Sequence, residues 1–232
     1  MRSICVIPAR GGSKRIPHKN IVDFFGKPLI SYAIQTAKKA EIFDEIIVST
    51  DDEDIANISI KYGANVPNLR PKELSDDFTS SDEVEDFVVK EFIKQGQYFD
   101  ISCQLYATAV LLKPQFLKLG YKALLNDKNL QYSLGVCEFP STIFRSFELI
   151  DDKCKMFYPN HYLTRSQDLP KAYFDAGQFC FRRLNIPRKI NVFDKCTKAI
   201  ILPRELVCDI DTMQDLEFAK KLYAISIKDK ND

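Results

Sequence analysis

Short apolar runs rich in β-branched residues alternate along this chain with stretches whose apolar residues recur at helical spacing. The apolar runs lie at 3–9, 45–50, 101–108, 132–139 and 172–181. The stretches with helical spacing lie at 28–37, 53–62, 81–95, 114–125 and 213–224. Because parallel strands need crossover connections, this alternation predicts an α/β fold in which helices cover both faces of a largely parallel sheet.

The length of 232 residues suits one domain, because single hydrophobic cores of this size are common. One segment, residues 139–171, breaks the alternation of strands and helices. We expect it to form an arm or small sub-lobe of a single domain at 1–232, packed on a partner or over the functional site.

The charges are balanced, with 33 Lys and Arg against 32 Asp and Glu and a net charge of +1. Proteins that grip nucleic acid with their whole surface usually have a strong basic excess, so nucleic acid is not an expected partner. No apolar run reaches the roughly 18 residues that cross a bilayer, and no apolar signal segment begins the chain. We therefore expect a cytoplasmic protein that does not enter a membrane.

Seven cysteines are spread over the sequence without a CxxC pair, which indicates reduced thiols in a reducing compartment. His18 and His161 are the only histidines. A zinc site built from histidines is therefore not expected, whereas oxygen-ligated magnesium stays open.

The loop after the first apolar run is strongly basic, with the sequence RGGSKRIPHKN at 10–20. Glycine lets backbone N–H groups approach an anion closely, and the arginines and lysines balance phosphate charge. We therefore expect a triphosphate at this loop, with a solvated basic loop as the alternative. The spacing fits neither a Walker A loop nor a GxGxxG turn, which disfavours ATPases and dehydrogenases.

Asp209 and Asp211 are separated by one residue at the end of the apolar run 205–210. In a strand, alternate side chains point to the same face, so the two carboxylates would converge. Converging carboxylates suit Mg²⁺, which binds one or two of them together with substrate phosphates and water. The alternative is a pair of acids that cap the last helix. The basic loop near the start of the chain favours the metal site.

Arg165 lies in a polar segment, RSQDLP at 165–170. Its guanidinium can hold a planar carboxylate through two hydrogen bonds, which makes an acidic sugar a candidate ligand. A surface arginine without a ligand is the alternative.

The order and spacing of several segments resemble the CMP-sugar synthetase family, whose members activate nonulosonic acids. The segments are PARGGSKRIPHKN, RPKELSDDFTSS, TRSQDLP, DAGQF and CDIDTMQDLEFA. The resemblance runs from Ile4 to about Leu222. Within the family, YATA, RSQDLPKAYFDAGQF and LVCDIDT most resemble the branch that activates pseudaminic acid.

The resemblance implies a three-layer, Rossmann-like nucleotidyltransferase fold of the GT-A-like kind. It implies a cytidylyltransferase that takes CTP and an acidic nine-carbon sugar, uses Mg²⁺ as cofactor, and releases pyrophosphate. The CMP-sugar would serve surface or flagellin glycosylation. Because the family usually dimerises, the resemblance also implies a homodimer, with the arm at 139–171 as the contact.

The resemblance also assigns roles to residues. The expected triphosphate-binding residues are Arg10, Gly11, Gly12, Ser13, Lys14 and Lys19. Those expected to meet the cytosine nucleotide are Asn20, Arg70 and Ser81. The expected sugar-site residues are Tyr106, Arg165, Gln167, Asp175 and Gln178. Asp209 and Asp211 match the metal-binding acids, and together with Arg10 and Lys19 they are the expected catalytic residues.

Two positions depart from the family pattern: Val110 stands where relatives have Pro, and Phe174 where His is familiar. Either change is expected to retune the sugar pocket. The acceptor of the sugar hydroxyl's proton stays open between Asp211 and a metal-bound hydroxide.

Other functions remain as alternatives. Related enzymes activate N-acetylneuraminate, legionaminate or the eight-carbon acid of lipopolysaccharide. A glycosyltransferase with a DxD motif is disfavoured because its acids would be expected nearer the middle of the chain. A non-catalytic nucleotide-binding module is disfavoured because it would not need both the acidic pair and Arg165.

Overall fold

The protein is described from a computed structural model, which covers residues 1–189 and 191–228. Its centre is a six-stranded sheet with the strand order β10-β6-β9-β5-β1-β4. These strands are Ser3–Pro8 (β1), Glu45–Ser49 (β4), Ile101–Leu105 (β5), Tyr132–Glu138 (β6), Tyr173–Arg183 (β9) and Thr197–Ile201 (β10). Parallel pairs join β1 to β4, β1 to β5, and β6 to β10. The expected α/β fold with a mostly parallel sheet is confirmed.

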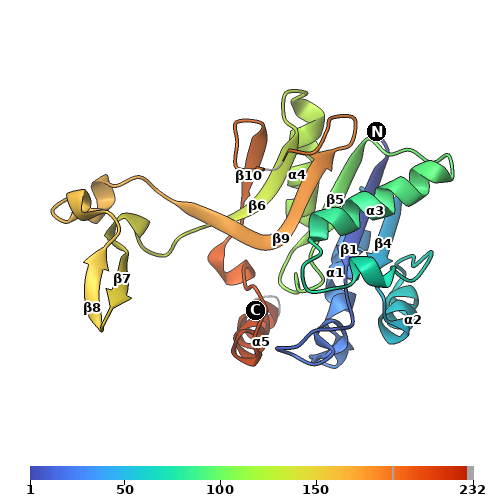
Figure 1. Ribbon diagram of the computed structural model, residues 1–232, viewed down its shortest axis with the longest axis horizontal. Coiled ribbons are helices and arrows are strands. Elements are labelled where there is room, and N and C mark those ends of the chain that lie inside the picture. The colour runs from blue at the N-terminus through green and yellow to red at the C-terminus, as the bar shows by residue number, and fades with distance from the viewer. Residues whose placement is uncertain (190, 229–232) are drawn as a thin grey trace.

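Helices cover both faces of this sheet, as Figure 1 shows. The α-helices are Ile30–Ala40 (α1), Glu53–Tyr62 (α2), Ser81–Lys94 (α3), Pro114–Asn126 (α4) and Met213–Lys228 (α5). On one face α3 packs against β1 and β5, and on the other α4 packs against β6, β9, β10 and α1. None of the described helices is long and apolar enough to cross a bilayer.

Two hydrophobic cores result from the alternation of side chains along β1. Cys5 and Ile7 face the larger core on the α1 and α4 side, whereas Ile4 and Val6 face α3. All four side chains are fully buried. This two-sided burial explains why the first apolar run is continuous rather than alternating.

Local sequence signals set the ends of the helices that flank the site. The Asp52 carboxylate accepts a hydrogen bond from the N–H of Ile55 at 3.0 Å and so caps α2. Gly63 ends α2 in the left-handed region, with a φ of 92°. Ser80 and Glu83 form a reciprocal capping box that starts α3 at Ser81.

The strand β9 lies between β5 and β6 and is antiparallel to both. It is the last of these three in the chain but separates the other two in space. The sequence predicted a strand at 172–181, which is confirmed apart from its ends, but not its direction. The direction of such a strand leaves no sequence signal, because a buried antiparallel strand has the same kind of apolar run as the parallel strands beside it.

Two expected apolar runs end differently in the structure. The strand expected at 101–108 stops at Leu105. The run at 205–210 is not a strand: it begins with the 3₁₀ turn Arg204–Leu206 and continues as extended chain without a sheet partner. Asp209 and Asp211 therefore do not lie on one face of a strand, contrary to the sequence-based expectation.

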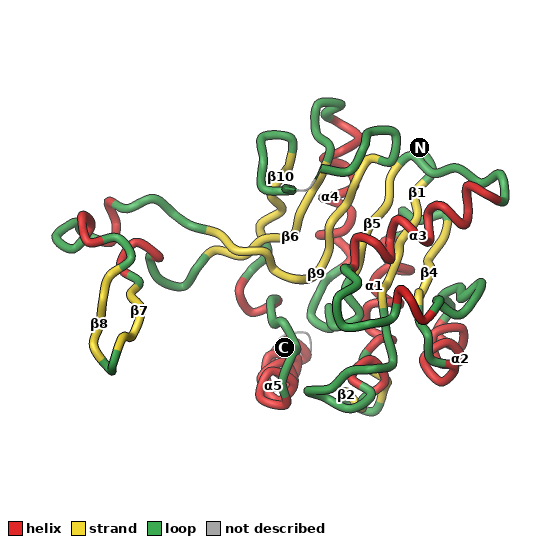
Figure 2. Tube along the Cα trace, viewed as in Figure 1, coloured by secondary structure: helices red, strands yellow, loops and turns green. Residues whose placement is uncertain are grey.

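The segment between β6 and β9 leaves the body of the molecule. It contains the hairpin of Phe147–Ile150 (β7) and Lys153–Met156 (β8), followed by the 3₁₀ turns Pro159–His161 and Ser166–Asp168. Figures 1 and 2 show this arm extending far from the sheet, with β7 and β8 at its end.

Candidate active site

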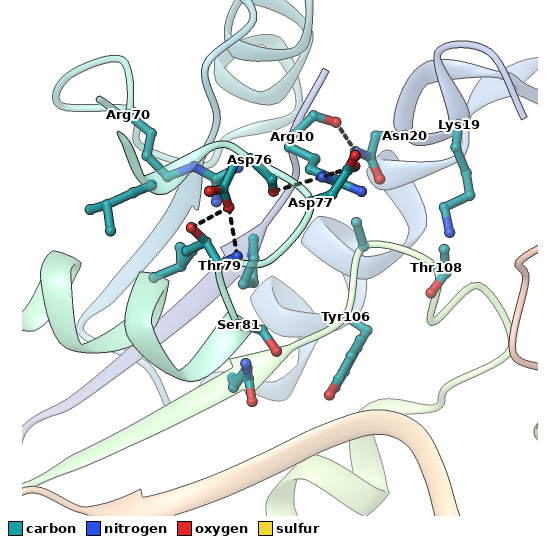
Figure 3. A pocket seen from close by; sticks show the side chains of 15 residues that line it. Arg10, Lys19, Asn20, Arg70, Asp76, Asp77, Thr79, Ser81, Tyr106 and Thr108 are labelled. Atoms are coloured by element: carbon teal, nitrogen blue, oxygen red, sulfur yellow. Dashed lines mark hydrogen bonds and ion pairs between the residues drawn. The ribbon is translucent and has the colours of Figure 1, made fainter. Parts of the chain in front are cut away.

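A cavity of about 290 Å³ opens where β1 and β5 end, and its lining is shown in Figure 3. Its walls come from the basic loop after β1, the segment between α2 and α3, the start of α3 and the segment at the end of β5. The expected site residues in this lining are Arg10, Lys19, Asn20, Arg70, Ser81 and Tyr106. Residues of four separate segments thus meet at the carboxyl edge of the sheet, where open α/β sheets bind ligands.

A second cavity of about 290 Å³ adjoins the first, because Arg10, Lys19, Asn20 and Asp77 line both. Ser13, Lys14 and Arg15 complete its lining. The cationic side chains of the basic loop therefore line a concave site. Such a site suits a multiply charged anion, which favours the triphosphate over the alternative of a solvated basic loop. The Asn20 amide donates to Arg10 O at 2.9 Å and closes the base of this loop.

Gly11, an expected triphosphate-binding residue, lies against the residues that precede α2. Its N–H donates to Asp51 Oδ1 at 2.9 Å, so this group already has a partner within the protein. A Cβ at Gly11 would lie 2.7 Å from Asp52 Oδ2. The close approach of the Asp52 side chain therefore favours glycine here, whereas the space around Gly12 is open.

Arg70 forms the wall opposite the basic loop and is only 5% exposed. Its N–H donates to Thr50 O at 2.7 Å, which fixes the chain just after β4. Burial lowers the pKa of its guanidinium, while the carboxylate of Asp51, 3.9 Å away, opposes that shift. Asp51 thus contacts both Gly11 and Arg70 and links the two walls of the cavity.

Ser81 and Tyr106 form the floor on the β5 side. Tyr106 follows β5 directly, and its N–H donates to Gln178 O of β9 at 2.9 Å. Burial raises the pKa of the Tyr106 phenol, and its hydrogen bond with Ser81 only partly offsets that effect. The phenol therefore keeps its proton at neutral pH and can donate a hydrogen bond to a ligand.

The acidic pair near the C-terminus meets the basic loop. Lys19 Nζ donates to Ile210 O at 2.8 Å and to Asp211 Oδ1 at 3.1 Å, and Arg15 lies 2.9 Å from Asp211 Oδ2. Burial first, and then the nearby charge of Asp211, raises the pKa of the Asp209 carboxyl. The two carboxylates are therefore close enough to interact, even though they are not in a strand.

The last helix is capped by other residues. Asp215 Oδ2 accepts hydrogen bonds from the N–H of Thr212 at 2.7 Å and from its hydroxyl at 2.8 Å. The N–H of Asp215 in turn donates to the Thr212 hydroxyl at 3.3 Å. Since Thr212 and Asp215 supply the cap, the alternative reading of Asp209 and Asp211 as helix caps is wrong.

Asp175 and Gln178 lie on β9 but do not line the cavity. Burial raises the pKa of the Asp175 carboxyl, which also accepts a hydrogen bond from the Gly177 N–H at 2.9 Å. Gln178 is 1% exposed, and its amide donates to Leu206 O at 2.6 Å. In this structure Gln178 therefore anchors the turn that leads to the acidic pair.

Arg165 and Gln167 lie on the arm, and neither residue lines either of the two cavities. The Arg165 side chain is 72% exposed and pairs with Asp168 at 2.7 Å. Within one chain the structure does not bring these residues to the other site residues.

The two departures from the family pattern also lie outside the first cavity. Val110 is 5% exposed and belongs to the larger core. Phe174 packs edge-on against Phe139, with ring centroids 5.0 Å apart, and lines a separate cavity on β6, β9 and β10.

Several lining residues were not predicted, notably Gln104, Asp76, Asp77, Thr79 and Thr108. Gln104 is 4% exposed, and its Nε2 has no partner among the described residues. A single glutamine within a buried apolar strand was the available signal for it. Asp76 and Asp77 lie in the segment RPKELSDDFTSS, where the resemblance assigns roles only to Arg70 and Ser81.

The described residues contain no group of three or more His, Cys, Asp or Glu side chains placed to hold a metal. Any divalent ion at this site would depend on the acidic pair and on ligands from its substrates. The arrangement therefore consists of a cationic cavity, a neighbouring polar cavity with an arginine wall, and two carboxylates beside the cations. Such a site can hold a polyphosphate and stabilise charge that moves along it.

Fold and site together define a nucleotide-binding α/β enzyme. The family model described as "Cytidylyltransferase" matches residues 4–230. The chain belongs to the cytidylyltransferase family and is therefore a nucleotidyltransferase, which confirms the expected family and enzyme class.

Relatives and solved structures give a more detailed picture. The chain is 47% identical over 228 residues to the pseudaminic acid cytidylyltransferase of Campylobacter jejuni subsp. jejuni serotype O:2, covering 97% of this chain and 98% of that protein. It is 39% identical over 120 residues to the CMP-N,N'-diacetyllegionaminic acid synthase of Legionella pneumophila, covering 51% of each. The structure of CMP:2-keto-3-deoxy-manno-octonic acid synthetase complexed with CTP superposes with a TM-score of 0.70, at 17% identity, over 97% of this chain and 100% of that one.

Proposed function

We propose that this enzyme couples CTP to pseudaminic acid, giving the CMP-sugar and pyrophosphate. The observation that carries the proposal is the continuity of the two cavities through Arg10, Lys19 and Asn20. One ligand can extend from the cationic cavity to the wall formed by Arg70. A nucleoside triphosphate would do so with its phosphates in the cationic cavity and its nucleoside near Arg70. The relative that shares 47% identity over almost its whole length supports the choice of sugar.

The proposed reaction is a displacement at phosphorus. The anomeric hydroxyl of the sugar attacks the α-phosphorus of CTP, the bond to the β-phosphate oxygen breaks, and pyrophosphate leaves. The hydroxyl proton passes to the acidic pair. Arg10, Lys14 and Lys19 hold the triphosphate and balance its charge, so positioning and electrostatics supply most of the acceleration.

Asn20, Arg70 and Ser81 are proposed to orient the cytidine, and Tyr106 and Asp175 the sugar. The Tyr106 phenol is protonated and faces the cavity, so it can donate to an oxygen of the acid. Gln178 is proposed to act indirectly. Its amide holds the turn at Leu206, and this turn positions Asp209.

Mg²⁺ is the proposed cofactor, and the donor set fits it. Mg²⁺ binds through one or two carboxylates together with phosphate oxygens and water, and Asp209 and Asp211 supply that number of carboxylates. Burial, and after it the charge of Asp211, raises the pKa of the Asp209 carboxyl, and a nearby cation would favour its ionised form. When bound, the ion neutralises negative charge on the phosphates.

We also propose a cytoplasmic homodimer in which the arm of each copy packs on the other. The arm exposes large apolar side chains, including Leu149, Tyr162 and Leu163, which are 66%, 69% and 88% exposed. Exposed apolar patches of this kind mark protein interfaces. Since Arg165 lies on this arm, it would bind the sugar's carboxylate in the site of the other copy.

The test is pyrophosphate release from CTP and Mg²⁺ by the purified protein. Pseudaminate, legionaminate, N-acetylneuraminate and the eight-carbon acid are offered in parallel. Release with pseudaminate alone is expected, whereas release with another acid would change the sugar and keep the reaction. CTP binding without release from any acid would favour a nucleotide-binding module. Lys19→Ala is the inactive variant, and Lys128→Ala, an exposed lysine elsewhere, is its control.

A further inference from the structure

A carboxylate of the protein occupies the place between two of the cations proposed to hold the triphosphate. Arg10 Nη1 donates to Asp77 Oδ1 at 2.8 Å, and Lys14 Nζ donates to Asp77 Oδ2. Each oxygen of the carboxylate thus meets one cation, as two oxygens of a phosphate would. Figure 3 shows the bond between Asp77 and Arg10 at the cavity.

Asp77 is ionised when it makes these contacts. The hydrogen bonds from Lys14 and Arg10 hold the pKa of its carboxyl below the usual range. At neutral pH a bound triphosphate and the Asp77 carboxylate are therefore both negative, and both have the same two cations as partners.

A folded turn presents this carboxylate. Asp76 Oδ1 accepts hydrogen bonds from the N–H of Phe78 at 3.0 Å and from the N–H of Thr79 at 2.7 Å. Arg10 Nη1 also donates to Asp76 O at 2.7 Å, which ties the turn to the basic loop. Phe78 at the tip is 92% exposed, so the turn can move away without unpacking the core.

We propose that Asp77 competes with the phosphates for Arg10 and Lys14, and thereby weakens CTP binding and promotes the departure of pyrophosphate. The inference rests on the proposed function. When the triphosphate enters, its oxygens replace the Asp77 carboxylate on both cations. After the reaction, the ion pairs of Asp77 form again as pyrophosphate leaves.

The test compares Asp77→Asn with the unmodified protein by calorimetry, using pyrophosphate, CTP and CMP in the presence of Mg²⁺. Because exposed ion pairs contribute modestly, pyrophosphate and CTP are expected to bind about threefold to tenfold more tightly to Asp77→Asn. CMP, which lacks the displaced phosphates, should bind equally to both proteins. Pyrophosphate should also become a stronger product inhibitor of Asp77→Asn.

Two variants serve as controls. Asp77→Glu keeps the carboxylate and should bind pyrophosphate like the unmodified protein. Glu73→Gln removes an exposed acid from the neighbouring turn, and Glu73 has no ion pair in the described part of the chain, so affinity should not change.

Unchanged or weaker pyrophosphate binding by Asp77→Asn would overturn the proposal. Weaker binding would instead indicate that Asp77 positions Arg10 and Lys14 for the phosphates. An equal gain in affinity for CMP would also overturn it, since the effect would not depend on the displaced phosphates. If the unmodified protein bound pyrophosphate but not CTP, the proposed function would fail, while the comparison with pyrophosphate would still decide the role of Asp77.

Discussion

Lys19 Nζ lies 3.1 Å from Asp211 Oδ1, although the two residues are 192 positions apart in the chain. The same ammonium group donates to Ile210 O at 2.8 Å. Lys19 therefore contacts both the cavity and the acidic pair, and its side chain is only 20% exposed. This contact joins the cationic loop after the first strand to the segment before the last helix.

Asp211→Ala is expected to abolish turnover and leave the fold intact, because the carboxylate holds no core contact. Lys19→Ala should lower kcat by about 10²-fold or more, the usual cost of losing one group that stabilises transition-state charge. Pyrophosphate release measures turnover, and circular dichroism checks the fold. Near-normal activity of Asp211→Ala would rule out the metal-binding role of the pair.

Glu85 anchors α3, the helix that begins at Ser81, to the strand β9. It is 1% exposed, pairs with Arg188, and lies 3.6 Å from Arg182 Nε. Glu85→Ala should lower the free energy of unfolding by about 2 kcal/mol, because Arg182 and Arg188 lose a buried charged partner and keep only their more exposed ones, such as Asp86. Glu91→Ala removes an exposed ion pair with Lys94 on the same helix and should cost less than about 1 kcal/mol. Equal losses in urea unfolding would contradict the anchoring role.

The thiols should differ strongly in reactivity. Cys154 is exposed on β8, whereas burial raises the pKa of the Cys208 thiol to about 11. Because the thiolate is the reactive form, Cys208 should stay largely unreactive at pH 8 and react only as the pH approaches that value. Iodoacetamide should label Cys154 first, as peptide mass spectrometry would show, and Cys154→Ser should remove the fast phase. Labelling of Cys208 at pH 8 as fast as Cys154 would refute its shielding.

The arm offers a direct test of self-association. Leu163→Asp changes a side chain that is 88% exposed, so it should leave each chain folded but convert a dimer into monomers. Ile60→Asp, at a position on α2 that is 54% exposed, is the matched control and should stay dimeric. Light scattering at working concentration measures both masses. A monomeric mass for the unmodified protein would remove the basis for a dimer.

The sequence allowed the layers and the cationic part of the site to be predicted. The run at 3–9 and the basic loop that follows it are local features, so a buried strand and the loop at its carboxyl end could be read from neighbouring residues. The cap at Asp52 and the helix end at Gly63 are local in the same way.

Features that depend on distant contacts could not be predicted in this way. The direction of β9 depends on which strands it separates. The carboxylate of Asp77 contacts Lys14, which lies 63 residues earlier in the chain. The strand expected before the last helix failed for a related reason: apolar residues at 206 and 210 are buried by contacts with the core rather than by strand pairing. The position of Arg165 also depends on the course of the arm, not on its neighbouring residues.

The central position of β9 bears on how the chain reaches its native state. The strands β5 and β6 cannot become hydrogen-bonded neighbours, because β9 fills the gap between them and pairs with both. The sheet therefore stays in two pieces until residues 173–183 arrive, after the whole arm has been synthesised. Contacts of such large sequence separation slow folding, and each unfinished piece exposes a strand edge. We expect the insertion of β9 to be the slow step of folding, and an arm that lengthens this loop to delay it further.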